Sequence, residues 1–167
     1  MNESDAVGGS PRVLVAGDGL TVGDPAGVRD RFMIDGKDAD GRFALVQHLF
    51  APKALAAPMH RHHKEDEYTY VLAGRIGAIL GGQEVFAEPG DLIFKPRNQW
   101  HTFWNAGDEP ASVLELISPA GLEEFFRALG TMEDLDSETL AALAAPYECD
   151  ADMDATLPLV ERHGLSF

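Results

Sequence analysis

Short stretches in which apolar and polar residues alternate run through the first two thirds of this 167-residue chain. This pattern is typical of β-strands with at least one buried face. The strands that it predicts lie at residues 29–34, 43–50, 67–73, 91–94, 101–105 and 111–117. The glycine pair at 81–82 separates two further apolar runs, as in a two-residue hairpin. The chain therefore predicts an all-β fold, either a sandwich or a closed barrel.

The two ends of this β region have different patterns. Residues 1–10 are small and polar, and we expect a disordered tail there. Residues 11–24 predict two short strands around an Asp-Gly turn. The barrel domain is accordingly expected to span residues 11–118.

Helical spacing replaces alternation after residue 118. Ser118 is expected to cap a helix whose first residue is Pro119 and which stops at Gly130. Its apolar stripe consists of Leu122, Phe125, Phe126 and Leu129. A second helix is predicted over residues 137–145, and a short helix or an extended arm over 155–167. We expect residues 119–167 to form a helical extension that packs on the barrel or at a dimer interface.

Three residues with metal-binding side chains lie close together at His60, His62 and Glu67. On an extended segment, residues two apart leave the same face, so a single ion can reach both imidazoles. In a helix the same spacing would point the two rings apart. Two imidazoles and a carboxylate on one face form a facial triad with open positions, as in non-haem iron sites.

A fourth ligand candidate, His101, begins the strand at residues 101–105. A turn is expected before it, at Pro96 and Asn98, and a compact meander would return His101 to the side of His60 and His62. The sequence therefore predicts a site built from three histidines and one glutamate.

Both stretches resemble the two motifs of the cupin family. The first motif is HxH, four residues, Glu, six residues and Gly, and the second is Gly, five residues, Pro-x-Gly, two residues, His, three residues and Asn. The matching positions are His60, His62, Glu67 and Gly74 in the first, and Gly90, Pro96, His101 and Asn105 in the second. Asn98 stands where the family has Gly, and Asn tolerates the left-handed backbone conformation of such a turn.

The resemblance implies a double-stranded β-helix, or jelly roll, that carries a divalent first-row metal ion such as Fe, Mn, Ni, Co, Cu or Zn. It also implies His60, His62, Glu67 and His101 as ligands, and frequently a homodimer. The leading functional hypothesis is a quercetin-dioxygenase-like oxygenase, in which Glu67 is a ligand or accepts the substrate proton. A redox-neutral isomerase, epimerase or cyclase and a non-catalytic small-ligand-binding protein are the alternatives, because fold alone does not define function.

Parity along the strands predicts the residues around this site. If Glu67 and His101 face inward, so do Thr69, Val71 and Phe103. This wall is largely apolar and indicates a small apolar or aromatic metabolite as substrate. Gln47 and His48 lie on opposite faces of their strand, and the register that decides which one reaches the pocket is open. For His48, a hydrogen-bonded structural role is the preferred interpretation.

Charge and composition exclude several classes of partner. The formal net charge of −15 argues against binding to nucleic acid or to an anionic membrane surface. The chain has neither a long apolar run nor a signal-peptide pattern, and its single cysteine, Cys149, permits no internal disulfide. These features predict a cytoplasmic protein that binds a small molecule.

Overall fold

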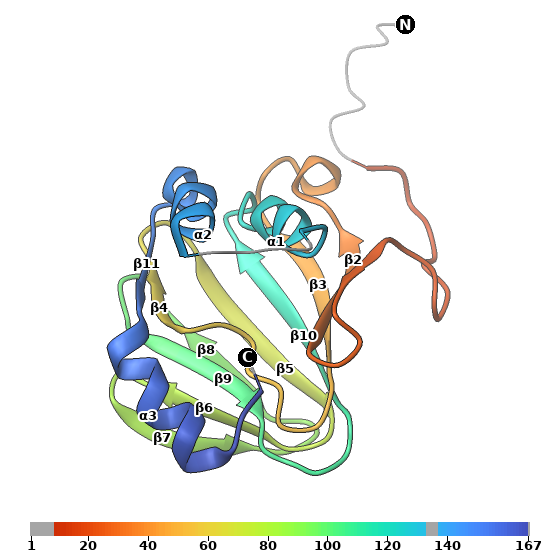
Figure 1. Cartoon of the computed structure of the whole chain (residues 1–167). Coiled ribbons are helices and arrows are strands. Elements are labelled where there is room, and N and C mark those ends of the chain that lie inside the picture. Colours follow the sequence, from red (N-terminus) through yellow and green to blue (C-terminus); the bar gives the residue numbers. More distant parts are fainter. Residues whose placement is uncertain (1–8, 133–136, 167) are drawn as a thin grey trace, which may run out of the picture.

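Two antiparallel β-sheets face each other in the computed structural model, which describes residues 9–132 and 137–166 (Figure 1). The predicted tail lies largely outside these residues. The strands of the first sheet are, in spatial order, β1 (Thr21–Gly23), β2 (Val28–Ile34), β3 (Ala44–Phe50), β10 (Ala111–Ser118), β5 (Asp66–Ala73) and β8 (Leu92–Lys95). Those of the second are β11 (Cys149–Asp152), β4 (Met59–His62), β9 (His101–Asn105), β6 (Ile76–Leu80) and β7 (Gln83–Ala87). This is the predicted double-sheet jelly roll.

The strands predicted from alternation are present within one or two residues of their expected ends. On β3, Ala44, Val46, His48 and Phe50 are buried, whereas the three residues between them are only partly buried. Between β6 and β7, Gly81 and Gly82 have φ values of 55° and 84°, which confirms the two-residue hairpin. Asn98 has a φ of 64°, so its side chain is compatible with the left-handed turn that the family builds with Gly.

The first of the two strands predicted in residues 11–24 is wrong. Residues 11–15 form no strand, and Val13 is 86% exposed. The side chain of Arg31 donates hydrogen bonds to the carbonyls of Val15 and Asp18 instead. This backbone is thus held by a side chain and not by hydrogen bonds to a neighbouring strand, which a strand needs to be stable. Only the second strand forms, as β1.

The predicted start of the first helix is also wrong. Ser118 is the last residue of β10, and its hydroxyl donates to the carbonyl of Arg42. The helix α1 (Glu123–Leu129) begins five residues later, and the Glu123 carboxylate accepts hydrogen bonds from the backbone of Gly36 and Gly121. Pairing in the sheet thus outweighs the local capping signal of Ser118. Gly130 ends the helix as predicted.

In the rest of the C-terminal region, the predicted second helix is confirmed and the last segment is a helix instead of an extended arm. A strand that the sequence did not indicate lies between them. The α2 helix (Ser137–Ala144) continues into a 3-10 turn (Ala145–Tyr147) that contains Pro146. β11 then pairs with β4 at the edge of the second sheet, and α3 (Met153–His163) follows as a helix that ends at Gly164. A short 3-10 helix (Gly36–Ala39) is the remaining element.

Three apolar clusters hold these layers together. One fills the space between the sheets, a second packs α1 and α2 against Val46 and Ile117, and a third packs α3 against Trp104. Figure 1 shows α1 and α2 above one end of the barrel and α3 beside β6 and β7. None of the helices in the described ranges is long and apolar enough to cross a membrane.

Candidate metal centre

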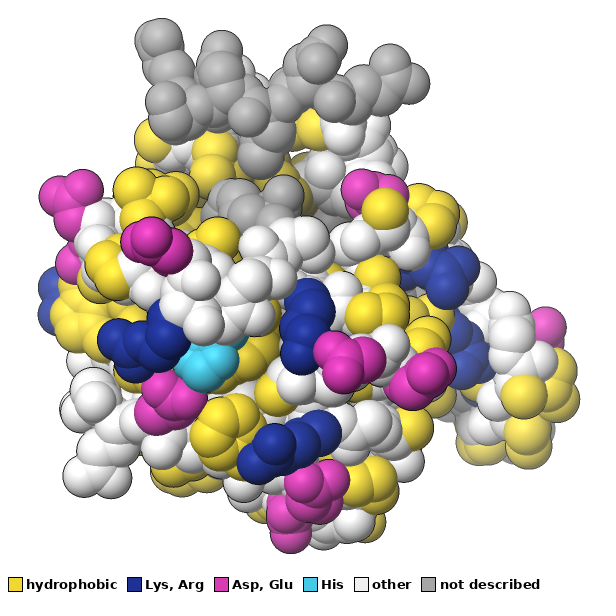
Figure 2. Space-filling model, turned by 60° about the horizontal axis from the view of Figure 1, so that its bottom comes forward, with side chains coloured by type: hydrophobic (Ala, Val, Ile, Leu, Met, Phe, Trp, Pro, Cys, Tyr) yellow, Lys and Arg dark blue, Asp and Glu magenta, His cyan; other side chains and the backbone are white. Residues whose placement is uncertain are grey.

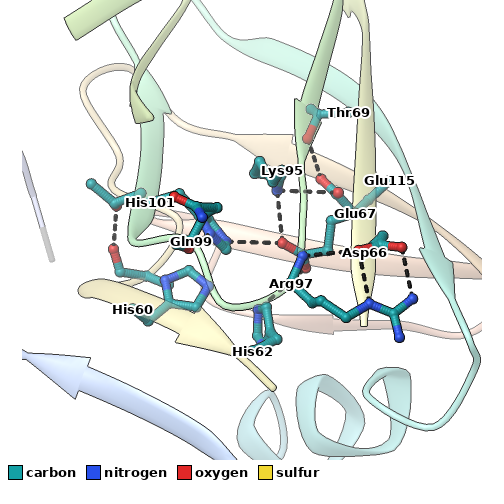
Figure 3. A network of polar contacts seen from close by, with 12 residues as sticks. His60, His62, Asp66, Glu67, Thr69, Lys95, Arg97, Gln99, His101 and Glu115 are labelled. Carbon is teal, nitrogen blue, oxygen red and sulfur yellow. Dashed lines mark hydrogen bonds and ion pairs between the residues drawn. The ribbon is translucent and has the colours of Figure 1, made fainter. Parts of the chain in front are cut away.

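The four predicted ligands meet inside the barrel, from three different strands. His60 and His62 come from β4, Glu67 from β5 and His101 from β9, and His60 and His101 are direct partners in the sheet. One potential ligand atom from each residue lies within 4.8 Å of the others. The four residues are only 2–7% exposed. Figure 3 shows the imidazoles and the carboxylate turned toward one another.

Two backbone carbonyls orient the imidazoles. The Nδ1 of His60 lies 2.8 Å from the carbonyl oxygen of Pro58, and the Nδ1 of His101 lies 3.0 Å from that of Gln99. Because a carbonyl only accepts, each Nδ1 carries a proton. In a neutral His60 ring this leaves Nε2 with its lone pair for an ion, whereas the Nε2 of His101 lies 3.0 Å from Glu67 Oε2. Backbone groups that fix the tautomer in this way are typical of histidines that bind metals.

The protonation of the histidines also fits a metal ion. Burial, together with His101 and His62, lowers the pKa of His60 well below its usual value. Burial lowers the pKa of His62 to about 4. Both rings are therefore neutral at pH 7, which is the form that binds metals. Neither ring nitrogen of His62 has a hydrogen-bond partner among the described residues, although both are buried.

Glu67 supplies the negative charge of the centre. Its Oε2 lies 3.0 Å from His101 Nε2 and 3.1 Å from Lys95 Nζ, and its Oε1 lies 3.6 Å from His62 Nε2. Burial raises the pKa of Glu67, but the Lys95 ammonium and the neighbouring His62 outweigh it and hold this pKa well below the usual value. Three imidazoles and one carboxylate match the donors that first-row divalent ions take in proteins, so the residues fit such an ion.

The prediction of a largely apolar inner wall is wrong. Thr69, Val71 and Phe103 face inward as parity predicts, but so do the charged residues Lys95 and Glu115, and all five are buried. The Lys95 ammonium lies 3.1 Å from Glu115 Oε1, and the Thr69 hydroxyl donates a hydrogen bond to Glu115 Oε2. A charged network therefore lies directly behind Glu67.

Of the two candidates on β3, His48 is the one that faces inward. Its Nδ1 lies 2.6 Å from Asp30 Oδ1 and its Nε2 4.0 Å from Glu115 Oε2, so His48 extends the charged network. The preferred interpretation as a hydrogen-bonded residue is confirmed. Gln47 lies on the outer side, where its amide donates to the Ser112 hydroxyl.

The sequence contains signals for the two charged residues that the prediction omitted. Glu115 is the single charged residue in the strand ASVLELI, whose alternation gives it the same face as Val113 and Ile117. Lys95 directly follows the predicted strand 91–94, and one more residue of strand would have placed it opposite Glu67. Only the pairing of β10, β5 and β8 brings the two side chains together.

Comparison with known proteins agrees with this geometry. Residues 46–117 match the family model described as "Cupin domain", and these residues include all four clustered side chains. Residues 46–117 of the chain are therefore a cupin domain.

The curated relatives of this chain are longer proteins with different names. It is 31% identical over 125 residues to quercetin 2,3-dioxygenase of Bacillus subtilis, an alignment that covers 74% of this chain and 36% of that protein. It is 37% identical over 75 residues to the tetracenomycin polyketide synthase protein TcmJ of Streptomyces glaucescens, covering 45% of this chain and 50% of that protein. The chain thus spans between about a third and a half of the curated relatives' lengths.

Among solved structures, KdgF from Halomonas sp. matches with a TM-score of 0.60 at 19% identity. The match covers 69% of this chain and 99% of KdgF. At this identity the comparison supports the jelly-roll fold alone.

Proposed function

We propose that this protein is a metal-dependent oxygenase that acts on a small molecule. The observation that carries the proposal is the buried cluster of three imidazoles and one carboxylate. The similarity to quercetin 2,3-dioxygenase supports oxygen chemistry over the other activities that this fold hosts.

The residues of the cluster would have distinct roles. His60, His62 and His101 would hold a divalent ion through their Nε2 atoms. Glu67 would be the fourth ligand, or would accept the proton of a substrate hydroxyl. The ion, when bound, supplies Lewis acidity and open positions for a substrate oxygen. Burial of the four side chains would keep bulk water away from the reacting groups.

The charged interior changes the expected substrate. Phe103 and Val71 offer an apolar surface, whereas Lys95 and Glu115 offer charge on the same wall. A small molecule that combines an apolar body with an acidic enol or phenol oxygen would suit both. The slight exposure of the cluster also favours a small substrate over a macromolecule.

Oxygen consumption tests this proposal. The purified protein would be freed of metal, loaded separately with each of the first-row ions named above, and supplied with flavonols and 1,3-dicarbonyl compounds in an oxygen electrode. Oxygen uptake with at least one ion is expected, and uptake should be lost in His101→Ala. If no ion and no substrate in the panel produce uptake, the oxygenase proposal fails.

A redox-neutral reaction such as isomerisation, epimerisation or cyclisation is the second candidate. The ionisable groups of the inner wall, Lys95, Glu115 and His48, favour it, because proton transfer needs no oxygen. Turnover under anaerobic conditions would establish this candidate. A ligand that co-purifies unchanged and stays unchanged in oxygen would instead indicate a binding protein.

The predicted homodimer is part of the same proposal. Large apolar side chains are exposed on the outer side of β5 and β8, at Tyr70, Leu72, Leu92 and Phe94, where a second copy would cover them. Figure 2 shows a face on which acidic and basic side chains are interspersed, so the overall negative charge creates no single-sign patch there. A monomer in sedimentation equilibrium would contradict the dimer.

The cytoplasmic location stays a prediction.

A further inference from the structure

Lys95 is a buried cation directly behind the metal centre. It is 1% exposed and lies opposite Glu67 in the pairing of β8 with β5. Its ammonium is 3.1 Å from Glu67 Oε2, 3.1 Å from Glu115 Oε1 and 4.0 Å from the centre of the Phe103 ring. The ammonium thus joins a candidate metal ligand to a second carboxylate, as Figure 3 shows.

Stability alone does not explain this arrangement. Lysine is almost never fully buried without a partner, and removing an ion pair from water costs more than the pair often returns. Apolar residues of similar volume are frequently as stable in such places. The Phe103 ring, whose centre lies 4.0 Å from the ammonium, is an apolar neighbour of this side chain. A role toward Glu67 accounts for the charged residue better than a role in packing.

The partners of Lys95 make it rigid. Glu115 comes from β10, and the hydroxyl of Thr69 on β5 donates to its Oε2 at 2.6 Å. His48 on β3 approaches the same oxygen at 4.0 Å. The ammonium is therefore anchored to neighbouring strands of the first sheet, while two of the three histidines stand on β4 of the second. Lys95, Glu115 and Glu67 all stand on the first sheet, so the ammonium can hold the one ligand of that sheet in place toward the histidines of the second.

We propose that Lys95, anchored by Glu115, is a positioning residue that fixes the Glu67 carboxylate among the three imidazoles for ion binding. The proposal rests on the metal centre of the proposed function and is independent of its oxygen chemistry. Glu67 would then act as a ligand, because the ammonium holds Oε2 and leaves Oε1 beside the imidazole of His62, 3.6 Å from its Nε2.

Geometry and charge make opposite predictions when Lys95 is removed. If Lys95 only places a positive charge near the ion, its removal relieves repulsion and the ion binds more tightly. If Lys95 positions Glu67, its removal frees the carboxylate to rotate and the ion binds more weakly. Outer partners of metal ligands typically contribute about 10-fold to 100-fold in affinity. We therefore expect a loss in this range.

The experiment compares Lys95→Met with the double variant Lys95→Met and Glu115→Gln, which also removes the Glu115 charge that the single variant leaves unpaired and is used if the single variant fails to fold. Lys37→Met, at an exposed lysine distant from the cluster, is the matched control. Affinity for Co²⁺ would be measured by competition with a chromogenic chelator. The visible absorption of bound Co²⁺ would report the ligand set, and circular dichroism would confirm folding.

The expected result is a loss of about 10-fold or more in Co²⁺ affinity in the folded variants, with a changed Co²⁺ spectrum. Lys37→Met should behave as wild type. Unchanged or tighter binding, or an unchanged spectrum, would overturn the positioning role. A wild-type protein that binds Co²⁺ but consumes no oxygen would overturn the oxygenase proposal alone, whereas a wild-type protein that binds no ion would overturn both.

Discussion

The packing of Trp104 over Gly77 gives the sharpest prediction about stability. Gly77 lies on β6 directly opposite Trp104 on β9, the strand that also carries His101. A Cβ added to Gly77 would lie less than 3.0 Å from three atoms of the indole ring. The indole is fully buried, between this strand and the apolar side chains of Leu159 and Leu165, so it has no free space into which to move.

The expected cost of Gly77→Ala follows from two opposing effects. Overpacking in a core costs about 1–3 kcal/mol. Replacing glycine at a compatible backbone position gains about 0.4–1 kcal/mol, because the unfolded chain loses freedom. The steric effect is larger, so the free energy of unfolding should fall by about 1–2 kcal/mol. In a chain of this length, this corresponds to a fall in Tm of about 2–8 °C.

Chemical denaturation monitored by circular dichroism would measure this change. Gly27→Ala is the matched control, because its added Cβ would meet its nearest atom at an ordinary 3.8 Å. Combining Gly77→Ala with Trp104→Leu should remove the penalty of the glycine substitution, since the indole is then absent. The steric reasoning is refuted if Gly77→Ala is neutral or stabilising, or if its cost is the same in the Trp104→Leu background.

Two further predictions concern the inner network and the C-terminal helix. Burial lowers the pKa of His48, but the Asp30 and Glu115 carboxylates outweigh it and raise this pKa above 6.5. The pair with Asp30 should therefore stabilise the fold fully below about pH 6.5 and lose its effect as pH rises through the folded-state pKa. Denaturation from pH 5.5 to 9 should show this decline in wild type but not in Asp30→Asn, and equal slopes would contradict it. Leu159→Ala, which removes a buried contact of α3, should cost about 2–5 kcal/mol and expose the C-terminal segment to limited proteolysis. An unchanged cleavage pattern would show that α3 is held by other contacts.

The central cluster was predictable because the spacing of residues within short segments of the sequence indicates where its side chains point. His60 and His62 share a face of one short strand, and Glu67 begins the next, so spacing alone indicates their direction. The turn at Asn98 fixes how His101 enters β9. These relations involve neighbouring residues, which makes them visible without knowledge of the sheet order.

The misplaced elements depend on distant contacts instead. The segment CDAD of β11 alternates over only four residues, with Cys149 and Ala151 as its apolar positions, and it becomes a strand because it pairs with β4. Ser118 looks like a helix cap, but pairing extends β10 through it. Lys95 and Glu115 form a network only once β10, β5 and β8 are aligned. The inner wall, which strand parity alone predicts to be largely apolar, thus contains the charged residues Lys95 and Glu115 in the structure.

Metal content is the measurement that tests the central claim most directly. Elemental mass spectrometry would be applied to the purified wild type and to the double variant His60→Ala and His62→Ala, each before and after incubation with first-row divalent ions. The account predicts about one equivalent of a first-row metal ion in the wild type and none in the double variant. Absence of metal from the wild type after incubation, or equal content in both proteins, would contradict the assignment of this cluster as a metal centre.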